Sequence, residues 1–488
     1  MRRSNGWKSW CVSSLACLFL VGCTAAIGGQ AWAQAGGDGQ ELGYDIAETG
    51  LTGRTWVVSP RGSDSADGTE ADPLKTIQAA ADRVNPGDTV LIRQGTYKNN
   101  DESDFAVAVL QRGGTAENWV RFANYPGETP VIEFNSLRGI MIQAADYLVV
   151  EGLEIDGRSD EVNPREAVAY AEAYDGTDFS QGRFFGVGIR VGTRDDKPGD
   201  FSHHLILRNN KIHHCSGGGI ATARADYLLI ENNEIFRCGL YSPWGESGIS
   251  VWQSANHDHR RDVYRTVIKD NLCYQNDNFV KFWILDSFSD GNGIILDALQ
   301  NTQSELIGGG QVDPYSGRIL IVNNVCFLNG GRGVNVYESD NADIVHNTLL
   351  YNGQRDNIKN EIELGRAHHI RVFNNLIAVA PGKRAVGGYQ SEDIAIDYNL
   401  IHGTKGTDFS TGDHSLAEPP GLRRMPPETI SRRAKVVPLD RLDFRPDPRS
   451  AAVGAGTPEH VFPIDHAGKP RDPAGPVTVG AHVPAGSP

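Results

Sequence analysis

The chain has 488 residues, and its 46 Lys and Arg against 61 Asp and Glu give a formal net charge of −15 at pH 7. This acidic balance argues against nucleic acid as a partner, because nucleic-acid-binding domains are usually basic. A protein of this charge that binds an acidic polymer must use local cations or a bound metal ion. The hydrophobic content of 39% and the 56 glycines suit a β-rich fold with many turns.

Residues 1–33 have the pattern of an export signal. Basic residues precede a short apolar stretch from Cys11 to Gly22, and residues 31–33 read Ala-Trp-Ala, a small-x-small cleavage site. A second interpretation stays open, because residues 20–23 resemble the lipobox of bacterial lipoproteins and would leave Cys23 lipidated. No stretch is long enough for a membrane span. We therefore expect a secreted or periplasmic protein, with a membrane-anchored lipoprotein as the alternative.

An N-terminal cap is predicted next. Residues 34–53 are glycine-rich and are expected to form a flexible lead-in. Residues 73–84 then predict an amphipathic helix, with Asp72 as its cap and Pro73 at its first position. Its apolar face consists of Leu74, Ile77, Ala81 and Val84. Such a helix would close the open end of a solenoid, and residues 87–92 predict the first strand after it.

A short sequence motif occurs seven times between Leu205 and Ile401. It consists of an aliphatic residue, two positions of any type, an asparagine, one position of any type and another apolar residue. The asparagines are Asn210, Asn233, Asn271, Asn324, Asn347, Asn375 and Asn399. Their basic period of about 23 residues, with two insertions, is typical of a solenoid. Each unit contains short β-type runs broken by turn-forming Asn and Gly. The sequence predicts an all-β, right-handed parallel β-helix in which stacked asparagines form a hydrogen-bonded ladder.

The predicted β-helix covers residues 54–401. Residues 402–488 lose the repeat and become rich in Pro, Arg and Asp, so we expect an irregular C-terminal segment packed on the last coils. Cys215 and Cys238 share one repeat position, which leaves a disulfide between neighbouring coils open. Cys273 and Cys326 replace Ile or Leu and are predicted core thiols. We expect a monomer.

In each predicted coil a strand follows a turn glycine, and its side chains alternate between the interior and the surface. The outward positions of neighbouring strands form two rows. The first row is Arg190, Ala221, Ser250, Ile295, Asn335 and Glu363, and the second is Ala223, Trp252, Asp297, Tyr337 and Gly365. Aromatic rings beside a carboxylate on an open sheet suit sugar binding, because rings stack on pyranose faces. The predicted substrate-binding residues are Trp252, Tyr337, Asn335, Ser250, Glu363 and Arg190.

Four insertions interrupt the repeat near these rows, at about residues 160–186, 253–265, 277–289 and 299–317. Insertions in a solenoid form loops, often on the binding face. Loops of this length in a compact fold are usually functional. We expect them to wall a cleft around Trp252 and Asp297.

Several segments resemble a known group of proteins. These are the capping segment followed by GDTVLIRQGTY at residues 87–97, the asparagine ladder, and a closing stretch with DHAGKPRDP and VGAHV. Together they resemble the secreted pectate-lyase-like β-helix superfamily over residues 54–483. That superfamily includes pectate, alginate and chondroitinase B-type lyases, polygalacturonases and mannuronan epimerases. The polygalacturonase residue set and the WiDH and RxPxxR signatures of the main pectate-lyase family are absent.

The resemblance implies an acidic polysaccharide as the partner. A uronate lyase must neutralise the carboxylate, remove the neighbouring proton and protonate the leaving oxygen. Neutralisation often comes from Ca²⁺, which prefers oxygen ligands. The candidate ligands are Asp290, Asn292, Asp297 and Asp286. An ordinary tight turn at residues 290–293 is the alternative.

Two residues are candidates for the base. Arg332 occupies the position equivalent to Asn292, one coil along; alternatively it is a surface arginine paired with Glu338 or Asp340. Lys281 lies between aromatic pairs and is predicted to be partly buried, which would lower its pKa; alternatively it is a solvated loop lysine. His257 and His259 could form a zinc pair, but no other ligands at suitable spacing accompany them, which favours a solvated loop.

The sequence therefore predicts an exported lyase that cleaves an acidic polysaccharide by β-elimination, with Ca²⁺ as the candidate cofactor. A non-catalytic glycan-binding or structural protein and a uronate epimerase remain alternatives.

Overall fold

The computed structural model describes residues 46–99, 101–194, 199–303, 313–403, 406–432, 434–472 and 475–484. The expected export signal, its possible lipidation at Cys23 and most of the lead-in lie outside these ranges. Within them, no helix combines the length and the hydrophobicity that crossing a membrane requires.

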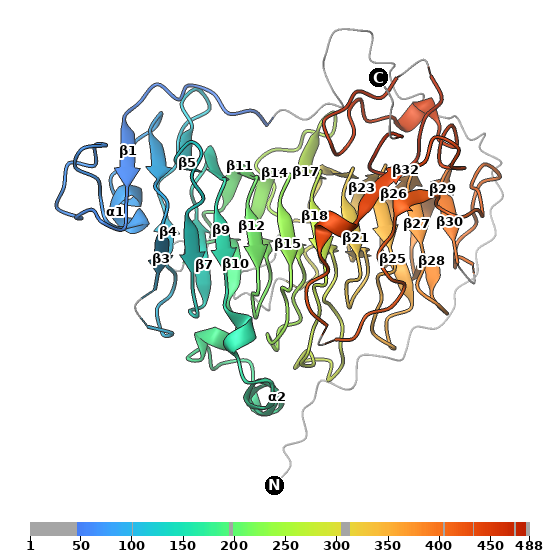
Figure 1. Cartoon of the computed structure of the whole chain (residues 1–488), viewed down its shortest axis with the longest axis horizontal. Helices are drawn as coiled ribbons and strands as arrows, with labels where there is room; N and C mark the ends of the chain where they lie inside the picture. Colours follow the sequence, from blue (N-terminus) through green and yellow to red (C-terminus); the bar gives the residue numbers. More distant parts are fainter. Residues whose placement is uncertain are drawn as a thin grey trace. The chain divides into compact units, whose positions relative to one another are not determined.

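Three parallel sheets, which we name A, B and C, form the body of the protein (Figure 1). Sheet A consists of β1 (Thr55–Val58), β2 (Thr89–Ile92), β5 (Val120–Asn124), β8 (Leu148–Glu151), β11 (Ser202–Arg208), β14 (Ala225–Glu231), β17 (Tyr264–Lys269), β20 (Arg318–Val322), β23 (Asp340–Val345), β26 (His368–Phe373) and β29 (Glu392–Asp397). Sheet B consists of β3 (Thr96–Lys98), β6 (Val131–Glu133), β9 (Glu154–Asp156), β12 (Lys211–His213), β15 (Glu234–Phe236), β18 (Leu272–Tyr274), β21 (Val325–Phe327), β24 (Thr348–Leu350), β27 (Leu376–Ala378) and β30 (Leu400–His402). Sheet C consists of β4 (Ala108–Leu110), β7 (Arg138–Gln143), β10 (Val187–Gly192), β13 (Ile220–Ala223), β16 (Ile249–Trp252), β19 (Ile294–Asp297), β22 (Val334–Tyr337), β25 (Asn360–Gly365) and β28 (Arg384–Tyr389).

From β2 onward the chain visits sheets A, B and C in turn, so each coil contributes one strand to each sheet. The architecture is the predicted right-handed parallel β-helix. The residues one position before the first outward-facing row are predicted to face inward, and all of them are fully buried; they are Ile189, Ile220, Ile249, Ile294, Val334 and Ile362. Stacked aliphatic side chains therefore fill the interior, and every second residue of sheet C faces out.

The predicted asparagine ladder is present. Each ladder Nδ2 donates to the Oδ1 atom of the next ladder asparagine at 3.0–3.1 Å. The backbone N–H of each of the first six donates to the same Oδ1 atom. At one end Leu153 N donates to Asn210 Oδ1 at 3.1 Å, and at the other Asn399 N donates to Ser415 Oγ at 3.2 Å. The ladder thus fixes the register between coils.

A second, shorter ladder was not predicted. Asn276, Asn329 and Asn352 donate in turn along the stack, and the last donates to Glu361 Oε2 at 2.8 Å. These asparagines lie five residues after three of the first-ladder asparagines, at the repeat position that Cys215 and Cys238 occupy in earlier coils. Burial raises the pKa of Glu361 to about 8. A carboxyl group that accepts from Asn352 through both of its oxygens therefore ends this ladder.

The four cysteines of the β-helix are buried free thiols. The disulfide that the sequence left open between Cys215 and Cys238 is not formed. The core position predicted for Cys273 and Cys326 is confirmed, because both are fully buried.

The capping helix starts later than predicted. Helix α1 spans Ile77–Ala81, and its cap is Thr76, whose Oγ1 accepts a hydrogen bond from Ala79 N at 3.1 Å. The prediction of Asp72 as the cap is wrong because Leu74 is still extended and pairs with β1 as an isolated parallel bridge. The predicted apolar residues are nevertheless buried; they are Leu74, Ile77, Ala81 and Val84.

The remaining regular elements lie in loops and in the C-terminal segment. They are α2 (Pro164–Ala173), the antiparallel pair β31 (Leu422–Arg424) and β32 (Asp443–Pro446), and 3-10 turns at Ser159–Glu161, Gly182–Phe184, Leu439–Arg441 and Pro458–His460. The C-terminal segment covers an apolar patch on sheet B, where Ala452, Val479 and Ala481 pack near the stacked rings of Tyr274 and Phe327.

We predict that Asn324→Ala lowers the free energy of unfolding by about 2–4 kcal/mol. Asn324 is fully buried, accepts from Asn271 and donates to both Asn347 Oδ1 and Ile268 O, so its loss leaves several buried groups unpaired. Urea unfolding of the two proteins measures the effect. Asn357→Ala, which removes an exposed amide that bonds only Phe288 O, is the matched control. Equal losses in both variants would contradict a structural role for the ladder.

Candidate functional site

The outward rows of sheet C have the register expected from the sequence. Strand pairing places Arg190, Ala221, Ser250, Ile295, Asn335 and Glu363 side by side on consecutive strands. The second row, Ala223, Trp252, Asp297, Tyr337 and Gly365, is equally continuous. Asp297 therefore lies one strand from an indole on one side and one strand from a phenol on the other. Residues 45 and 40 positions apart in the chain meet because the coils stack.

The Asp297 carboxylate is the least compensated acid of this face. Among the described residues it accepts no hydrogen bond from a side chain or from the backbone. Burial raises its pKa to about 8, and the charges of Asp290 and Glu338 contribute. Glu338 is itself held by Arg366 Nη1 at 2.5 Å and by the Thr302 hydroxyl. Carboxylates placed so that they repel one another are typical of a cation or proton-transfer site.

Asp290 is the second acid of the group. It accepts hydrogen bonds from Ser289 Oγ at 2.5 Å and from Asn292 Nδ2 at 3.2 Å. Burial raises its pKa to about 6; Glu246 adds to the rise, and Ser289 and Arg332 oppose it. Asp290 and Asp297 together are oxygen donors of the kind that Ca²⁺ prefers.

Asn292 positions its neighbours. The residue is fully buried, its Nδ2 donates to Ser247 Oγ at 2.9 Å, and its Oδ1 accepts from Arg332 N at 2.8 Å. Because that oxygen is already occupied, Asn292 is poorly placed to bind a metal ion in this arrangement. It joins the turns of three coils instead.

Arg332 is half-buried and paired. Its Nε and Nη2 atoms donate to Glu363 Oε2 at 2.8 and 2.6 Å, and Nη1 donates to Ser289 O at 2.5 Å. Its side chain is 12% exposed. The alternative of a surface pair with Glu338 or Asp340 is wrong, because the side chain turns toward the next strand and meets Glu363 in the first row.

Lys281 and Asp286 lie elsewhere on the loop. The two form an ion pair of 2.9 Å, with side chains 52% and 86% exposed. The prediction that Lys281 is partly buried is therefore wrong: the flanking aromatic residues turn toward other loops while the lysine points to solvent. Asp286 is bound to this lysine at the tip of a loop that an isolated bridge between Phe282 and Ser287 closes. Neither residue is joined to the acids of sheet C by a described hydrogen bond.

Cations gather at the other end of the same face. Burial lowers the pKa of Arg190 and lowers that of Arg138 to about 10. Among the described residues, the Arg190 guanidinium makes no hydrogen bond or ion pair. The charge of Glu246 acts on it and opposes the fall in its pKa. Glu246 Oε2 accepts from Gly218 N at 2.8 Å. Sheet C thus presents arginines first and carboxylates further along the stack.

Sequence reasoning missed Arg138 and Glu246. Glu246 comes two residues before the turn glycine Gly248. In the next coil, Asp290 likewise comes shortly before the turn glycine Gly293. The alignment of turn glycines that located Asp290 could therefore have located Glu246 as well.

The remaining predicted residues of the first row differ in access. Ser250 is half-buried, whereas Asn335 is buried, with 8% of its surface exposed. Asn335 therefore serves as part of the floor between Ile295 and Glu363.

The insertions line both edges of sheet C. Residues 157–186 and 275–293 connect sheet B to sheet C, whereas residues 253–263 and 298–317 connect sheet C to sheet A. Helix α2 belongs to the first of these loops and projects from the coils in Figure 1. An aromatic cluster joins the loops of the first edge: Trp244 Nε1 donates to Tyr174 OH at 2.9 Å, and Trp244 stacks on Phe179. These loops therefore form one packed wall.

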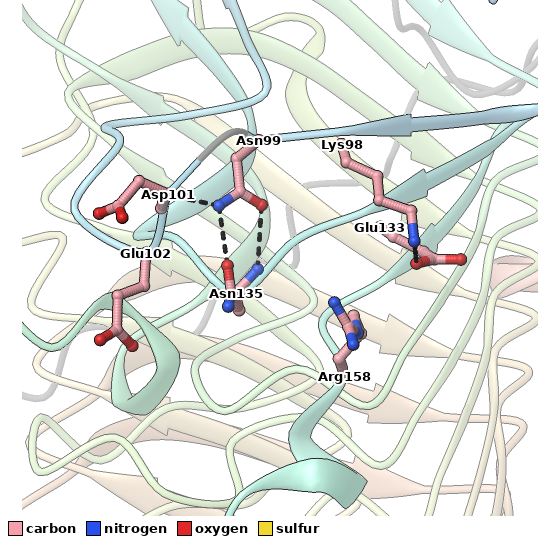
Figure 2. Close-up of a pocket in the computed structure, with 7 residues that line it drawn as sticks. All are labelled: Lys98, Asn99, Asp101, Glu102, Glu133, Asn135 and Arg158. Atoms are coloured by element: carbon pink, nitrogen blue, oxygen red, sulfur yellow. Dashed lines mark hydrogen bonds and ion pairs between the residues drawn. The ribbon is translucent and has the colours of Figure 1, made fainter.

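A polar pocket of about 430 Å³ lies away from this face (Figure 2). It is lined by Lys98, Asn99, Asp101, Glu102, Glu133, Asn135 and Arg158. Its charges largely satisfy one another, with Lys98 paired to Glu133 at 2.5 Å and Arg158 paired to Glu161 at 2.6 Å. We assign the candidate site to sheet C because Asp297 and Arg190 are not neutralised in this way within the described residues.

We predict that Asp297→Asn stabilises the metal-free protein by about 1–2 kcal/mol at pH 8, a figure reduced for solvent screening. The raised pKa of Asp297 means that its contribution to stability is present below its ordinary pKa and is lost as the pH rises to about 8. The uncharged amide does not titrate, so the gain should grow between pH 4 and pH 8. Thermal unfolding across this range, in chelator, measures it. A gain that is constant with pH would contradict the electrostatic origin.

The comparisons agree with this architecture. A family model described as the Pel9A-like, right handed beta helix region matches residues 56–368. Pectate lyase PEL9 of Emericella nidulans is 25% identical over 362 residues, which cover 67% of this chain and 78% of that protein. Pectate lyase L of Dickeya chrysanthemi is 21% identical over 466 residues, which cover 92% and 94%. The crystal structure of pectate lyase Pel9A aligns with a TM-score of 0.46 and 16% identity, over 91% of this chain and 99% of that chain. The chain belongs to the Pel9A-like family of right-handed β-helix proteins.

Proposed function

We propose that the protein is an exported lyase that cleaves an acidic, uronate-containing polysaccharide by β-elimination. The observation that carries the proposal is the uncompensated Asp297 carboxylate between Trp252 and Tyr337 on the outward face of sheet C. The pectate lyases among its relatives support an acidic sugar polymer as the substrate. The net charge of −15 makes a cation necessary for such a polymer to bind near these acids.

Asp290 and Asp297 suit a Ca²⁺ ion, because they are oxygen donors and the charge of Asp290 acts on Asp297, which has no hydrogen-bond donor of its own among the described residues. When bound there, the ion would neutralise the substrate carboxylate and make the neighbouring C–H bond more acidic. Trp252 and Tyr337 would stack on sugar rings to either side. Arg190 would attract the carboxylate of a more distant residue of the polymer.

In the reaction itself a base takes the proton from the carbon next to the carboxylate. The electron pair forms a carbon–carbon double bond, the bond to the glycosidic oxygen breaks, and that oxygen takes up a proton. We assign the base to Arg332, which must first pass a guanidinium proton to Glu363, the carboxylate that its Nε and Nη2 atoms contact. The glycosidic oxygen takes its proton from solvent water. Lys281 is the weaker candidate, because its ammonium points to solvent from a loop tip.

We predict that Arg332→Lys lowers kcat by about 100-fold or more with little change in KM, because proton transfer contributes about 10²–10⁴-fold. Lys281→Met should change kcat by less than about twofold, as expected for an exposed pair. Arg384→Lys, which alters an exposed ion pair with Asp408 on the last strand of sheet C, is the matched control. The opposite ranking, with Lys281→Met inactive and Arg332→Lys active, would assign the base to Lys281.

The activity itself is tested by ultraviolet absorbance of the mature protein with pectate, alginate, chondroitin or glucuronan, each with Ca²⁺ or with a chelator. We expect absorbance from the unsaturated product to rise with one polymer and to stop when the chelator removes the ion. A rise that the chelator does not affect would remove Ca²⁺ from the proposal. A flat trace with every polymer would overturn the lyase: retention on a polymer would then indicate a binding protein, and inversion at the uronate carbon by NMR an epimerase.

A further inference from the structure

Three histidines from two separate parts of the sequence meet beside strand β11 of sheet A. His203 and His204 belong to β11, and His257 belongs to the loop that joins β16 to β17. One ligand atom from each lies within 4.8 Å of the others. The Nδ1 atoms of His203 and His204 are 2.9 Å apart, and the ring centres of His203 and His257 are 3.9 Å apart.

The backbone explains how two consecutive residues can share a side. Neighbours along a strand normally face opposite ways, but His204 has a left-handed φ of 53°. Tyr147 and Tyr227 have the same conformation in the adjacent coils, and their rings stack on the His204 ring at 4.7 and 4.3 Å. The His204 imidazole is therefore fixed in orientation by its neighbours.

Two aspartates hold the other members in place. Asp146 Oδ1 accepts from His203 N at 2.9 Å, and its Oδ2 lies 3.6 Å from His203 Nε2. Asp226 Oδ2 accepts from His257 N at 2.7 Å and forms a fully buried ion pair with Arg265 at 2.5 Å. The His257 backbone is thus anchored although its side chain is exposed. Such supporting contacts are characteristic of metal-binding histidines.

We propose that His203, His204 and His257 bind one divalent transition-metal ion, for which Zn²⁺ is the best fit, with water in the fourth position. Three imidazoles and one water are a donor set that Zn²⁺ accepts in tetrahedral geometry. Zn–N bonds of about 2.0–2.1 Å place ligand nitrogens about 3.3 Å apart. The 2.9 Å pair must therefore open by about 0.4 Å.

A second group, Asp156, His213 and His214, is less suitable. His213 Nε2 already contacts Glu154 Oε1 at 3.0 Å, and the 2.7 Å between the Nδ1 atoms of His213 and His214 is shorter than the corresponding distance in the first group. The group also lacks a third imidazole. The sequence-based preference for a solvated loop at His257 is revised, because its partners come from β11 and not from the loop itself.

The ion would tie a wall of the candidate site to the coil stack. The loop that carries His257 begins directly after Trp252, and the ion would link it to β11. This site differs in chemistry from the carboxylates of sheet C, since imidazole favours Zn²⁺ and carboxylates favour Ca²⁺. It does not depend on the proposed lyase activity.

Calorimetry of the untagged, chelator-treated chain with Zn²⁺ tests the proposal. We expect one ion per chain that a large excess of Ca²⁺ does not displace, and intense visible bands of tetrahedral Co²⁺ when Co²⁺ is used instead. His257→Ala, which alters an exposed side chain, and His203→Ala should each weaken binding by at least about tenfold. His259→Ala, on the same loop but outside the cluster, is the matched control and should leave affinity unchanged, as should His213→Ala.

Thermal unfolding of the metal-free variants checks that each is folded. Absence of Zn²⁺ binding by the folded wild-type chain would overturn the proposal. So would binding that His257→Ala leaves intact, that His259→Ala weakens equally, or that only His213→Ala removes.

Discussion

The stacking of buried asparagines is the interaction on which the rest of the structure depends. A buried amide has both donors and an acceptor, and leaving any of them unpaired costs more than a hydrogen bond returns. Here each ladder amide is satisfied by the same residue one coil away, so a coil can dock in only one register. A slip of one residue would turn the aliphatic core outward and break the ladder at once. The aliphatic stack supplies the driving force for folding, and the ladder supplies the register.

Fixed register lets insertions grow without moving the site. Successive ladder asparagines around the longest insertions are 38 and 53 residues apart, yet their hydrogen bonds remain 3.0 Å. The connections from sheet B to sheet C pack on one another through their own aromatic cluster. Trp252, Asp297 and Tyr337 consequently keep adjacent positions although whole loops separate them in the chain. Chemistry on such a scaffold can vary through its loops while the strands stay constant.

The same physics explains what the sequence could predict. Period-2 alternation after aligned glycines was sufficient for the rows of sheet C, because every strand there obeys the same geometry. It was insufficient for long side chains in turns: Arg332 pairs with Glu363, and Lys281 points to solvent, for reasons that depend on loop packing. Helix α1 starts at Ile77 because Leu74 pairs with strand β1. The preferences of capping residues do not take such strand pairing into account. The meeting of His203 with His257 follows from loop closure and has no local signal.

The distribution of charge on sheet C argues that its acids serve a ligand and not the fold. Carboxylates that stabilise a protein have partners, as Asp226 has Arg265. Among the described residues Asp297 has none, and Arg332, whose charge acts on Asp290, is already paired with Glu363. Burial and repulsion keep the pKa of Asp297 near 8, so the ionised carboxylate destabilises the folded protein. A residue with only a structural role would not be expected to keep this destabilisation. An anionic polymer would meet this region as a further repulsion unless a cation intervened. If the proposed function holds, whatever binds between Trp252 and Tyr337 must therefore bring positive charge with it.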